Sequence, residues 1–255
     1  MTGPPIRAIT DGTAGRVHAF LLDWGEGLTL IDTLSSDTGD VVLAEMARMG
    51  RPVGDLKRIV LTHAHRSHVR GAARLRDLSG AQVITNAWEG EIVAGERPSA
   101  ATGFLPRRPF RVYQLQFGLN LGHYVERYLH RRPGFVSFPA CEPDRTIGDG
   151  DMVGPLQAIH TPGHTDGSMS FYWPAQRALF AGDVVVTWPR LEAGWKGLST
   201  DMDANRRSLS QLATVGEVEF VGSGHGPPLV DDAAVRLRDL LAGVRTPGRP
   251  PRPRA

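Results

Sequence analysis

The stretch Thr62-His63-Ala64-His65-Arg66-Ser67-His68 places three histidines within six residues. It directly follows the apolar run 59–61, which predicts a buried strand. Because side chains alternate along an extended chain, His63 and His65 point to the same side, and His68 follows where a helix begins. Neutral imidazole is the commonest protein ligand for zinc and related metals. The stretch therefore predicts a metal site, although isolated histidines in a loop can also be simply solvated.

Three later motifs have a related form, in which an apolar strand and a turn containing glycine accompany a His or Asp. They are His160-Thr161-Pro162-Gly163-His164-Thr165-Asp166-Gly167, Ala181-Gly182-Asp183 and Gly224-His225-Gly226. Ligands placed at strand ends by distant parts of a chain are how a sheet scaffold builds a rigid site. We therefore expect the four segments to converge in one cleft.

Taken together and in this order, the motifs resemble the signature of the metallo-β-lactamase superfamily. That signature is His-x-His-x-Asp-His, a His in a Thr-Pro-Gly-His turn, an Asp after Gly, and a late His. The matching residues are His63, His65, His68, His164, Asp183 and His225. The resemblance spans residues 6–230. It implies an α+β fold, the αββα sandwich, with two mixed β-sheets face to face and helices outside.

The resemblance also implies two metal positions. The first takes His63, His65 and His164, and the second takes His68, His225 and the signature Asp, while Asp183 bridges them. This chain has Ser67 where the signature has Asp. A neutral hydroxyl is a poor ligand for a dication compared with a carboxylate. We therefore expect one or two zinc ions per chain with a weakened second position, and iron or manganese stay open as alternatives.

The expected catalytic residues are Asp183, Ser67 and His68. Ser67 can hydrogen-bond a water molecule but cannot act as a base near pH 7. Asp166 is a candidate for the missing carboxylate, although a turn residue that caps its own backbone is the simpler interpretation.

The function that fits best is a metal-dependent hydrolase of a small-molecule ester, thioester or lactone. The metal would lower the pKa of a bound water to about 7, and the resulting hydroxide would attack a carbonyl. Two alternatives stay open. One is a mononuclear non-haem iron dioxygenase using His63, His164 and Asp183, because such a site needs two histidines and one carboxylate. The other is a degenerate or non-hydrolytic member of the superfamily, such as a lyase, a cyclase or a binding protein.

Composition excludes several other classes. A net charge of +2 gives no strong field for nucleic acid. No apolar run approaches the ~18 residues that a membrane helix needs. The single cysteine, Cys141, cannot form a disulfide within the chain, and the first residues lack a secretory apolar core. We therefore expect a cytoplasmic protein that acts on a small molecule, with no nucleic-acid or membrane partner.

Hydrophobic periodicity divides the chain into two halves, each with strands followed by helices. In the first half we expect strands at 7–10, 17–23, 28–31, 56–61 and 82–85 and helices at 32–50, 68–78 and 87–94. In the second half we expect strands at 156–159, 168–173, 177–180 and 217–221 and helices at 202–214 and 231–241. A single domain would thus cover residues 1–244.

Two segments fall outside this pattern. Residues 95–143 form an arginine- and aromatic-rich insertion containing an amphipathic helical pattern with His123 and His130. We expect this insertion to act as a lid, a packing helix or a homodimer contact. The segment 187–200, with Trp188 and Trp195, would supply a second apolar wall. Residues 245–255 hold four arginines and four prolines, which predicts a disordered tail.

Overall fold

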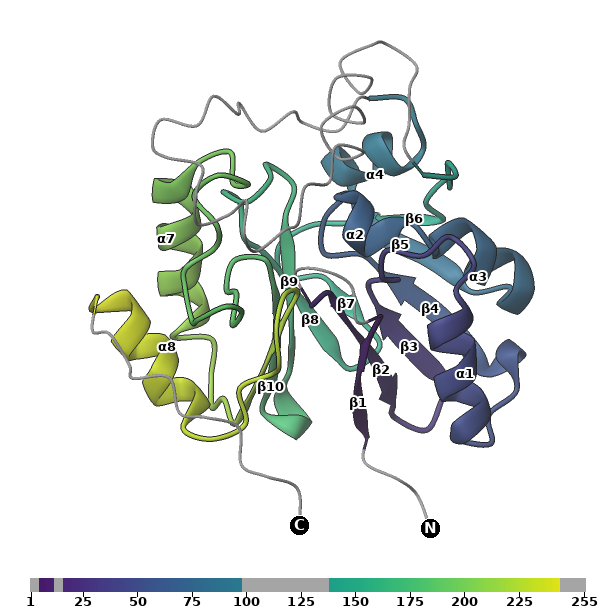
Figure 1. Ribbon diagram of the computed structural model, residues 1–255, viewed down its shortest axis with the longest axis horizontal. Coiled ribbons are helices and arrows are strands. Elements are labelled where there is room, and N and C mark those ends of the chain that lie inside the picture. The colour runs from purple at the N-terminus through teal and green to yellow at the C-terminus, as the bar shows by residue number, and fades with distance from the viewer. Residues whose placement is uncertain (1–4, 12–15, 98–137, 244–255) are drawn as a thin grey trace.

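The computed structural model describes residues 5–11, 16–97 and 138–243. Within these ranges, two β-sheets lie at the centre of the molecule, and helices cover their outer faces (Figure 1). The expected αββα sandwich is therefore confirmed. Most of the expected insertion at 95–143, including His123 and His130, and the expected tail at 245–255 lie outside the described residues.

The first sheet has six strands, which lie in the order in which they occur along the chain. Strands β1 to β3 pair antiparallel, and the pairs from β3 to β6 are parallel. The strands are β1 Ile6–Thr10, β2 His18–Asp23, β3 Leu28–Ile31, β4 Leu56–Val60, β5 Gln82–Asn86 and β6 Arg145–Ile147.

The second sheet has five strands in the order β11-β10-β9-β8-β7. All neighbouring pairs are antiparallel except β10 and β11, which are parallel. The strands are β7 Met152–Val153, β8 Leu156–His160, β9 Met169–Trp173, β10 Ala178–Gly182 and β11 Phe220–Ser223.

Helices cover each sheet on its outer face (Figure 1). Those on the side of the first sheet are α1 Asp40–Arg48, α2 Arg66–Val69, α3 Ala72–Ser79 and α4 Ala87–Val93. Those on the side of the second are α7 Met202–Leu212 and α8 Ala233–Leu241. Two short 3-10 turns occur at Val53–Asp55 and Pro174–Gln176.

Three apolar cores hold these four layers together. Strand β2 shows how, because its side chains alternate between the two faces of the sheet. Leu21 packs in the core beneath α1, α3 and α4, whereas Phe20 and Leu22 pack against Phe171 and Phe180 of the second sheet. A third core joins the second sheet to α7 and α8. A strand buried on both faces reads as a continuous apolar run, as these strands do.

The helix expected at 32–50 is wrong over its first eight residues, since α1 begins only at Asp40. Asp32 and Leu34 have φ angles of 58° and 65°, which are left-handed and end any helix there. The Asp32 carboxylate accepts hydrogen bonds from the backbone N–H and the hydroxyl of Thr62, each at 2.8 Å. This long-range contact holds the backbone after β3 out of the helical conformation.

The helix expected at 68–78 is interrupted, and the structure divides it into α2 and α3. The carbonyl of His68 accepts hydrogen bonds from the backbone N–H and the hydroxyl of Thr33, at 2.6 and 2.9 Å. The N–H of Gly71 donates to the same hydroxyl. A Cβ at Gly71 would lie 2.9 Å from the Thr33 carbonyl oxygen, so this close approach requires glycine. Thr33 thus bonds to the carbonyl of His68 and the N–H of Gly71, two backbone groups that would otherwise be available for hydrogen bonds within a continuous helix.

The candidate residues all follow the carboxyl ends of strands. The histidine stretch follows β4, and the motifs of His164, Asp183 and His225 follow β8, β10 and β11. Because the two sheets face one another, these strand ends meet at one edge of the sandwich. Among the described residues, no helix is long and apolar enough to cross a membrane.

Candidate metal centre

The structure brings together all six residues that the signature identifies. They form two groups in which the nitrogen and oxygen atoms lie within 4.8 Å of one another. The first group is His63, His65, His164 and Asp183, and the second is His68, Asp183 and His225. Residues from the two halves of the chain therefore share one site, as His68 and His225 do across 157 positions of sequence.

Asp183 lies between the two groups. Its Oδ2 is 3.3 Å from Nε2 of His164 and 3.3 Å from Nε2 of His225. Its Oδ1 is 3.7 Å from Nε2 of His68. Within the first group, Nε2 of His164 lies 2.8 Å from Nδ1 of His65, and within the second, Nε2 of His68 lies 3.3 Å from Nε2 of His225. One carboxylate is thus placed to serve both groups.

The electrostatics favour the metal-binding protonation states of His63, His164 and Asp183, whereas His68 is shifted toward its protonated form. Burial and the neighbouring imidazoles hold the pKa of His63 well below its usual value. Burial likewise lowers the pKa of His164 to about 4. Burial would raise the pKa of Asp183, but the imidazoles of His225, His68 and His164 outweigh it and hold that pKa well below its usual range. Neutral imidazoles around an ionised carboxylate are the forms in which these side chains bind metals.

Two buried atoms of the cluster show that a cation fits here. Nε2 of His63 and Oδ1 of Asp183 are buried, and neither has a hydrogen-bond partner among the described residues. An unsatisfied buried polar atom costs about 1–3 kcal/mol. A dication held by these nitrogen and oxygen donors would satisfy both atoms, and the mixture of imidazole and carboxylate suits zinc or iron.

Asp32 supports His68, and sequence reasoning missed it. The carboxylate is buried, and its Oδ2 lies 2.9 Å from Nδ1 of His68. For His68, burial lowers the pKa, but the carboxylates of Asp183 and Asp32 outweigh burial and raise it. A carboxylate on the far ring nitrogen fixes the orientation of a ligand histidine and increases its basicity. Asp32 directly follows an apolar strand, so the strand-end pattern that identified Asp183 would also have found it.

Two glycines allow the ligand loops to approach one another. A Cβ at Gly224 would lie 2.1 Å from Oδ1 of Asp183. A Cβ at Gly163 would lie 2.1 Å from the backbone nitrogen of Asn205, and Gly163 has a φ of 131°. Any side chain at 224 would therefore occupy the space between Asp183 and His68, and one at 163 would push the His164 loop away from α7.

Asp166 belongs to neither carboxylate-and-imidazole group, and Ser67 directly precedes the ligand His68. Ser67 occupies the second position of α2 and is half-buried. Asp166 is exposed, and its backbone carbonyl lies 2.9 Å from Nε2 of His160. Within the described residues, Asp166 therefore does not supply the missing carboxylate.

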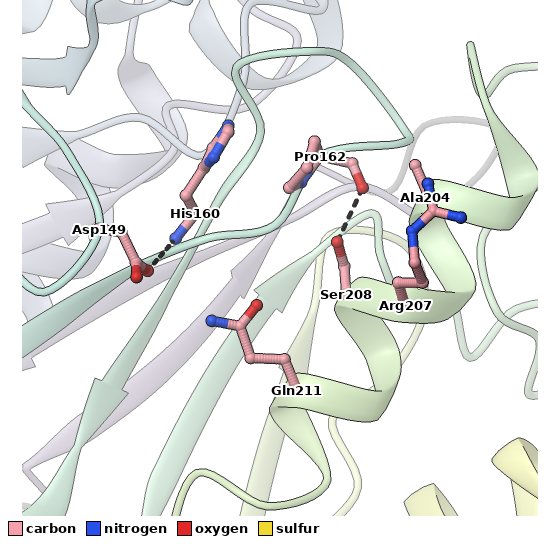
Figure 2. Close-up of a pocket in the computed structure, with 7 residues that line it drawn as sticks. All are labelled: Asp149, His160, Pro162, Ala204, Arg207, Ser208 and Gln211. Atoms are coloured by element: carbon pink, nitrogen blue, oxygen red, sulfur yellow. Dashed lines mark hydrogen bonds between the residues drawn. The ribbon is translucent and has the colours of Figure 1, made fainter.

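A separate pocket lies behind the loop that carries His164. This open pocket has a volume of about 320 Å³. Figure 2 shows the residues that line it, between the end of β8 and helix α7. It is lined by Asp149, His160, Pro162, Ala204, Arg207, Ser208 and Gln211. Ser208 donates to the carbonyl of Pro162 at 2.7 Å, and Asp149 accepts from the backbone N–H of His160 at 2.9 Å. No residue of the metal cluster lines it, so these contacts brace the loop from outside.

The segment 187–200 contributes Trp195 to the site. Its ring is 3% exposed and packs against the His225 ring, with centroids 4.4 Å apart. Trp188 lies further out, with its centroid 6.5 Å from that of Trp195. Trp195 therefore restrains a ligand histidine, while the wider wall expected from this segment stays a prediction.

Comparison with known families agrees with this geometry. The family model described as the metallo-beta-lactamase superfamily matches residues 12–225, which include all six clustered residues. The chain belongs to the metallo-beta-lactamase superfamily. The family resemblance expected from the sequence is confirmed.

Relatives within the superfamily include enzymes with named activities. A hydroxyacylglutathione hydrolase of Rhodospirillum rubrum is 32% identical over 136 residues, 48% of each chain. The acyl-coenzyme A thioesterase MBLAC2 of Gallus gallus is 25% identical over 176 residues, which are 65% of this chain and 55% of the relative. The chain thus spans about half the length of these two curated relatives.

Solved structures of the superfamily share the fold. TTHA1623 in a di-iron-bound form superposes with a TM-score of 0.65 at 24% sequence identity, covering 91% of this chain and 98% of the other. At this identity the likeness establishes the fold of the chain alone.

Proposed function

We propose that the chain is a metal-dependent hydrolase of a small-molecule thioester or a related ester or lactone. The observation that carries this proposal is the position of Asp183, whose carboxylate lies between two sets of buried imidazole nitrogens. A zinc-type dication bound in the cluster supplies Lewis-acid activation of water and of the scissile carbonyl.

The residues of the first group hold and orient the proposed metal. His63 and His164 are buried and their lowered pKa values keep them neutral. Nδ1 of His63 lies 2.9 Å from the Thr62 hydroxyl, and Nδ1 of His164 lies 3.3 Å from the Ser199 hydroxyl. These contacts restrain the rings so that their other nitrogens point into the cluster.

The residues of the second group form a position that differs from the first in its donors. His68 and His225 offer two imidazoles, and Asp183 stays ionised because its pKa is held low. Asp183 is therefore a ligand and not a proton acceptor. Ser67 stands where a carboxylate would complete the group, and its hydroxyl can orient the attacking water without accepting its proton. We propose that the second position is the weaker of the two and that it assists carbonyl polarisation and leaving-group stabilisation.

The proposed substrate class comes from the relatives. Both named relatives act on acyl groups attached to a thiol, namely hydroxyacylglutathione and acyl-coenzyme A. A thiolate is a good leaving group, so a site with a weakened second position suits a thioester better than an amide bond. Esters and lactones share the same attack on a carbonyl carbon.

A substrate panel with the zinc-loaded full chain tests the proposal. The panel contains a hydroxyacyl glutathione, an acyl-coenzyme A, an acyl homoserine lactone and a β-lactam, and thiol release or ring opening is followed optically. We expect thioester hydrolysis that chelation abolishes and added zinc restores. Zinc-loaded protein that hydrolyses neither thioester and does not open the lactone would contradict the proposal. Oxygen consumption by iron-loaded protein would favour the dioxygenase.

A further inference from the structure

Helix α4 carries a buried glutamate, Glu89. Glu89 lies in the first turn of α4, and its side chain is completely buried, with 0% exposure. Acidic side chains are almost never fully buried unless they are paired or well hydrogen-bonded. No basic side chain forms an ion pair with Glu89 among those that the structure describes, so its stabilisation comes from hydrogen bonds.

The Glu89 carboxylate receives three hydrogen bonds from the two loops that carry the first ligand group. Oε2 accepts from the backbone N–H of Ala64 at 2.7 Å. Oε1 accepts from the hydroxyl of Thr165 at 2.6 Å and from the backbone N–H of Gly167 at 3.0 Å. Ala64 lies between His63 and His65, and Thr165 follows His164. One side chain therefore connects the loops that supply all three imidazoles of that group.

The chemistry of these contacts requires an acceptor at both oxygens. The N–H groups of Ala64 and Gly167 can only donate, and they approach different oxygens. An ionised carboxylate accepts at both positions, whereas an amide would turn its NH₂ toward one of the two N–H donors. The fit is also tight, because a Cβ at Gly167 would lie 2.8 Å from Oε1 of Glu89. Glutamate is thus matched to both loops at once.

We propose that Glu89 is a positioning residue that sets the spacing between the His63–His65 loop and the His164 loop, and so tunes metal affinity at the first group. This inference rests on the proposed metal binding but not on the proposed substrate. The hydrogen bonds of Glu89 go to the loops of the first group, whereas the second group has its own support from Asp32 and Trp195. Loss of Glu89 should therefore weaken one position selectively.

The test is a cobalt(II) and zinc titration of the full chain against a competing chromophoric chelator, comparing wild type with Glu89→Gln. Glu91→Gln is the matched control, since Glu91 is on the same helix, pairs with Arg97 and is 44% exposed. His65→Ala and His225→Ala identify the signals of the first and second positions.

We expect Glu89→Gln to weaken the first position by about 10- to 100-fold and to alter its cobalt absorption, because residues that orient metal ligands have effects of this size. Glu91→Gln should match wild type.

A second variant guards against a folding defect in Glu89→Gln. Thr165→Val keeps the carboxylate and removes one of its donors, and we expect a smaller loss at the same position. Unchanged affinity and spectrum in a folded Glu89→Gln variant, or in Thr165→Val if the first does not fold, would overturn the proposal. An equal loss at both positions, with a lowered unfolding temperature, would also overturn it, since it would indicate a general structural role. Metal binding is measured without substrate, so an inert hydrolase would leave this test intact.

Discussion

The two ligand groups share Asp183, but the chain supports them unequally. The first group has four donors, and Glu89 connects its two loops. The second group has three donors, with Ser67 where the superfamily signature has Asp. Its two histidines are supported separately, His68 by Asp32 and His225 by Trp195. One shared carboxylate therefore lies between two groups whose other donors and supporting contacts differ.

Asp183→Asn should break both groups at once. The substitution keeps the size of the side chain and removes the negative charge that both groups use. We expect metal affinity at both positions, and the rate of hydrolysis, to fall by more than about 100-fold. Residues that only orient metal ligands have effects of about 10- to 100-fold, so loss of a ligand should cost more. Metal analysis after dialysis measures the effect. Asp166→Asn, an exposed neighbour of His164, is the control and should keep its metal. Full metal content in a folded Asp183→Asn variant would contradict the shared role.

Single histidine variants should separate the groups. His225→Ala removes one donor of three from the second group, and His65→Ala removes one donor of four from the first. We expect His225→Ala to keep one tight metal per chain and to lose most of the binding at the other position, by about 100-fold. Calorimetric titration gives both stoichiometry and affinity. Identical titration curves for the two variants would show that the groups are not distinct.

Ser67→Asp should make the two groups more alike in metal affinity, because it places a carboxylate beside the second group. A carboxylate near a dication adds Coulomb attraction worth a few kcal/mol at a protein surface, so second-site affinity should rise by about tenfold or more. The first group should be unchanged. Ser67→Asn, which is of similar size but neutral, is the control in the same titration. Equal affinity in Ser67→Asp and wild type would mean that Ser67 does not face the second position.

The smallest expected effect is a pH dependence of the metal-free protein. His164 has a folded pKa of about 4, below the ordinary value of 6.5, so the unfolded chain binds its proton first as pH falls. Its contribution therefore lowers stability as pH falls from about 6.5 to 4. The lowered pKa of His63 acts in the same direction, whereas the raised pKa of His68 opposes it. Denaturant unfolding at pH 7 and pH 5 should show lower stability at pH 5. Higher stability at pH 5 would contradict this expectation and would show that the raised pKa values of His68 and Glu89 outweigh the lowered ones.

Much of the fold was predictable because local patterns and tertiary packing agree. Strand β3 and the helix α4 lie where periodicity placed them. The failures at 32–39 and at Gly71 share one cause, which is a contact between the segment after β3 and the histidine stretch. Such contacts override local helical preference, and no window of sequence contains both partners. The short strands β6 and β7 were missed because two or three residues carry too little periodicity.

The candidate ligand side chains, and their positions after strand ends, could be identified from local sequence patterns alone. His63, His164, Asp183 and His225 were readable because each ligand motif carries its own local signal of apolar residues, glycine and a donor. The place of Asp183 between both groups, and the hydrogen bonds of Asp32 and Glu89 to the ligand segments, depend on folding because their partners are distant in the sequence. The local sequence around a buried helical glutamate does not differ from that around an exposed one. The position of Glu89 is stabilised by hydrogen-bond donors from loops that are distant in the sequence.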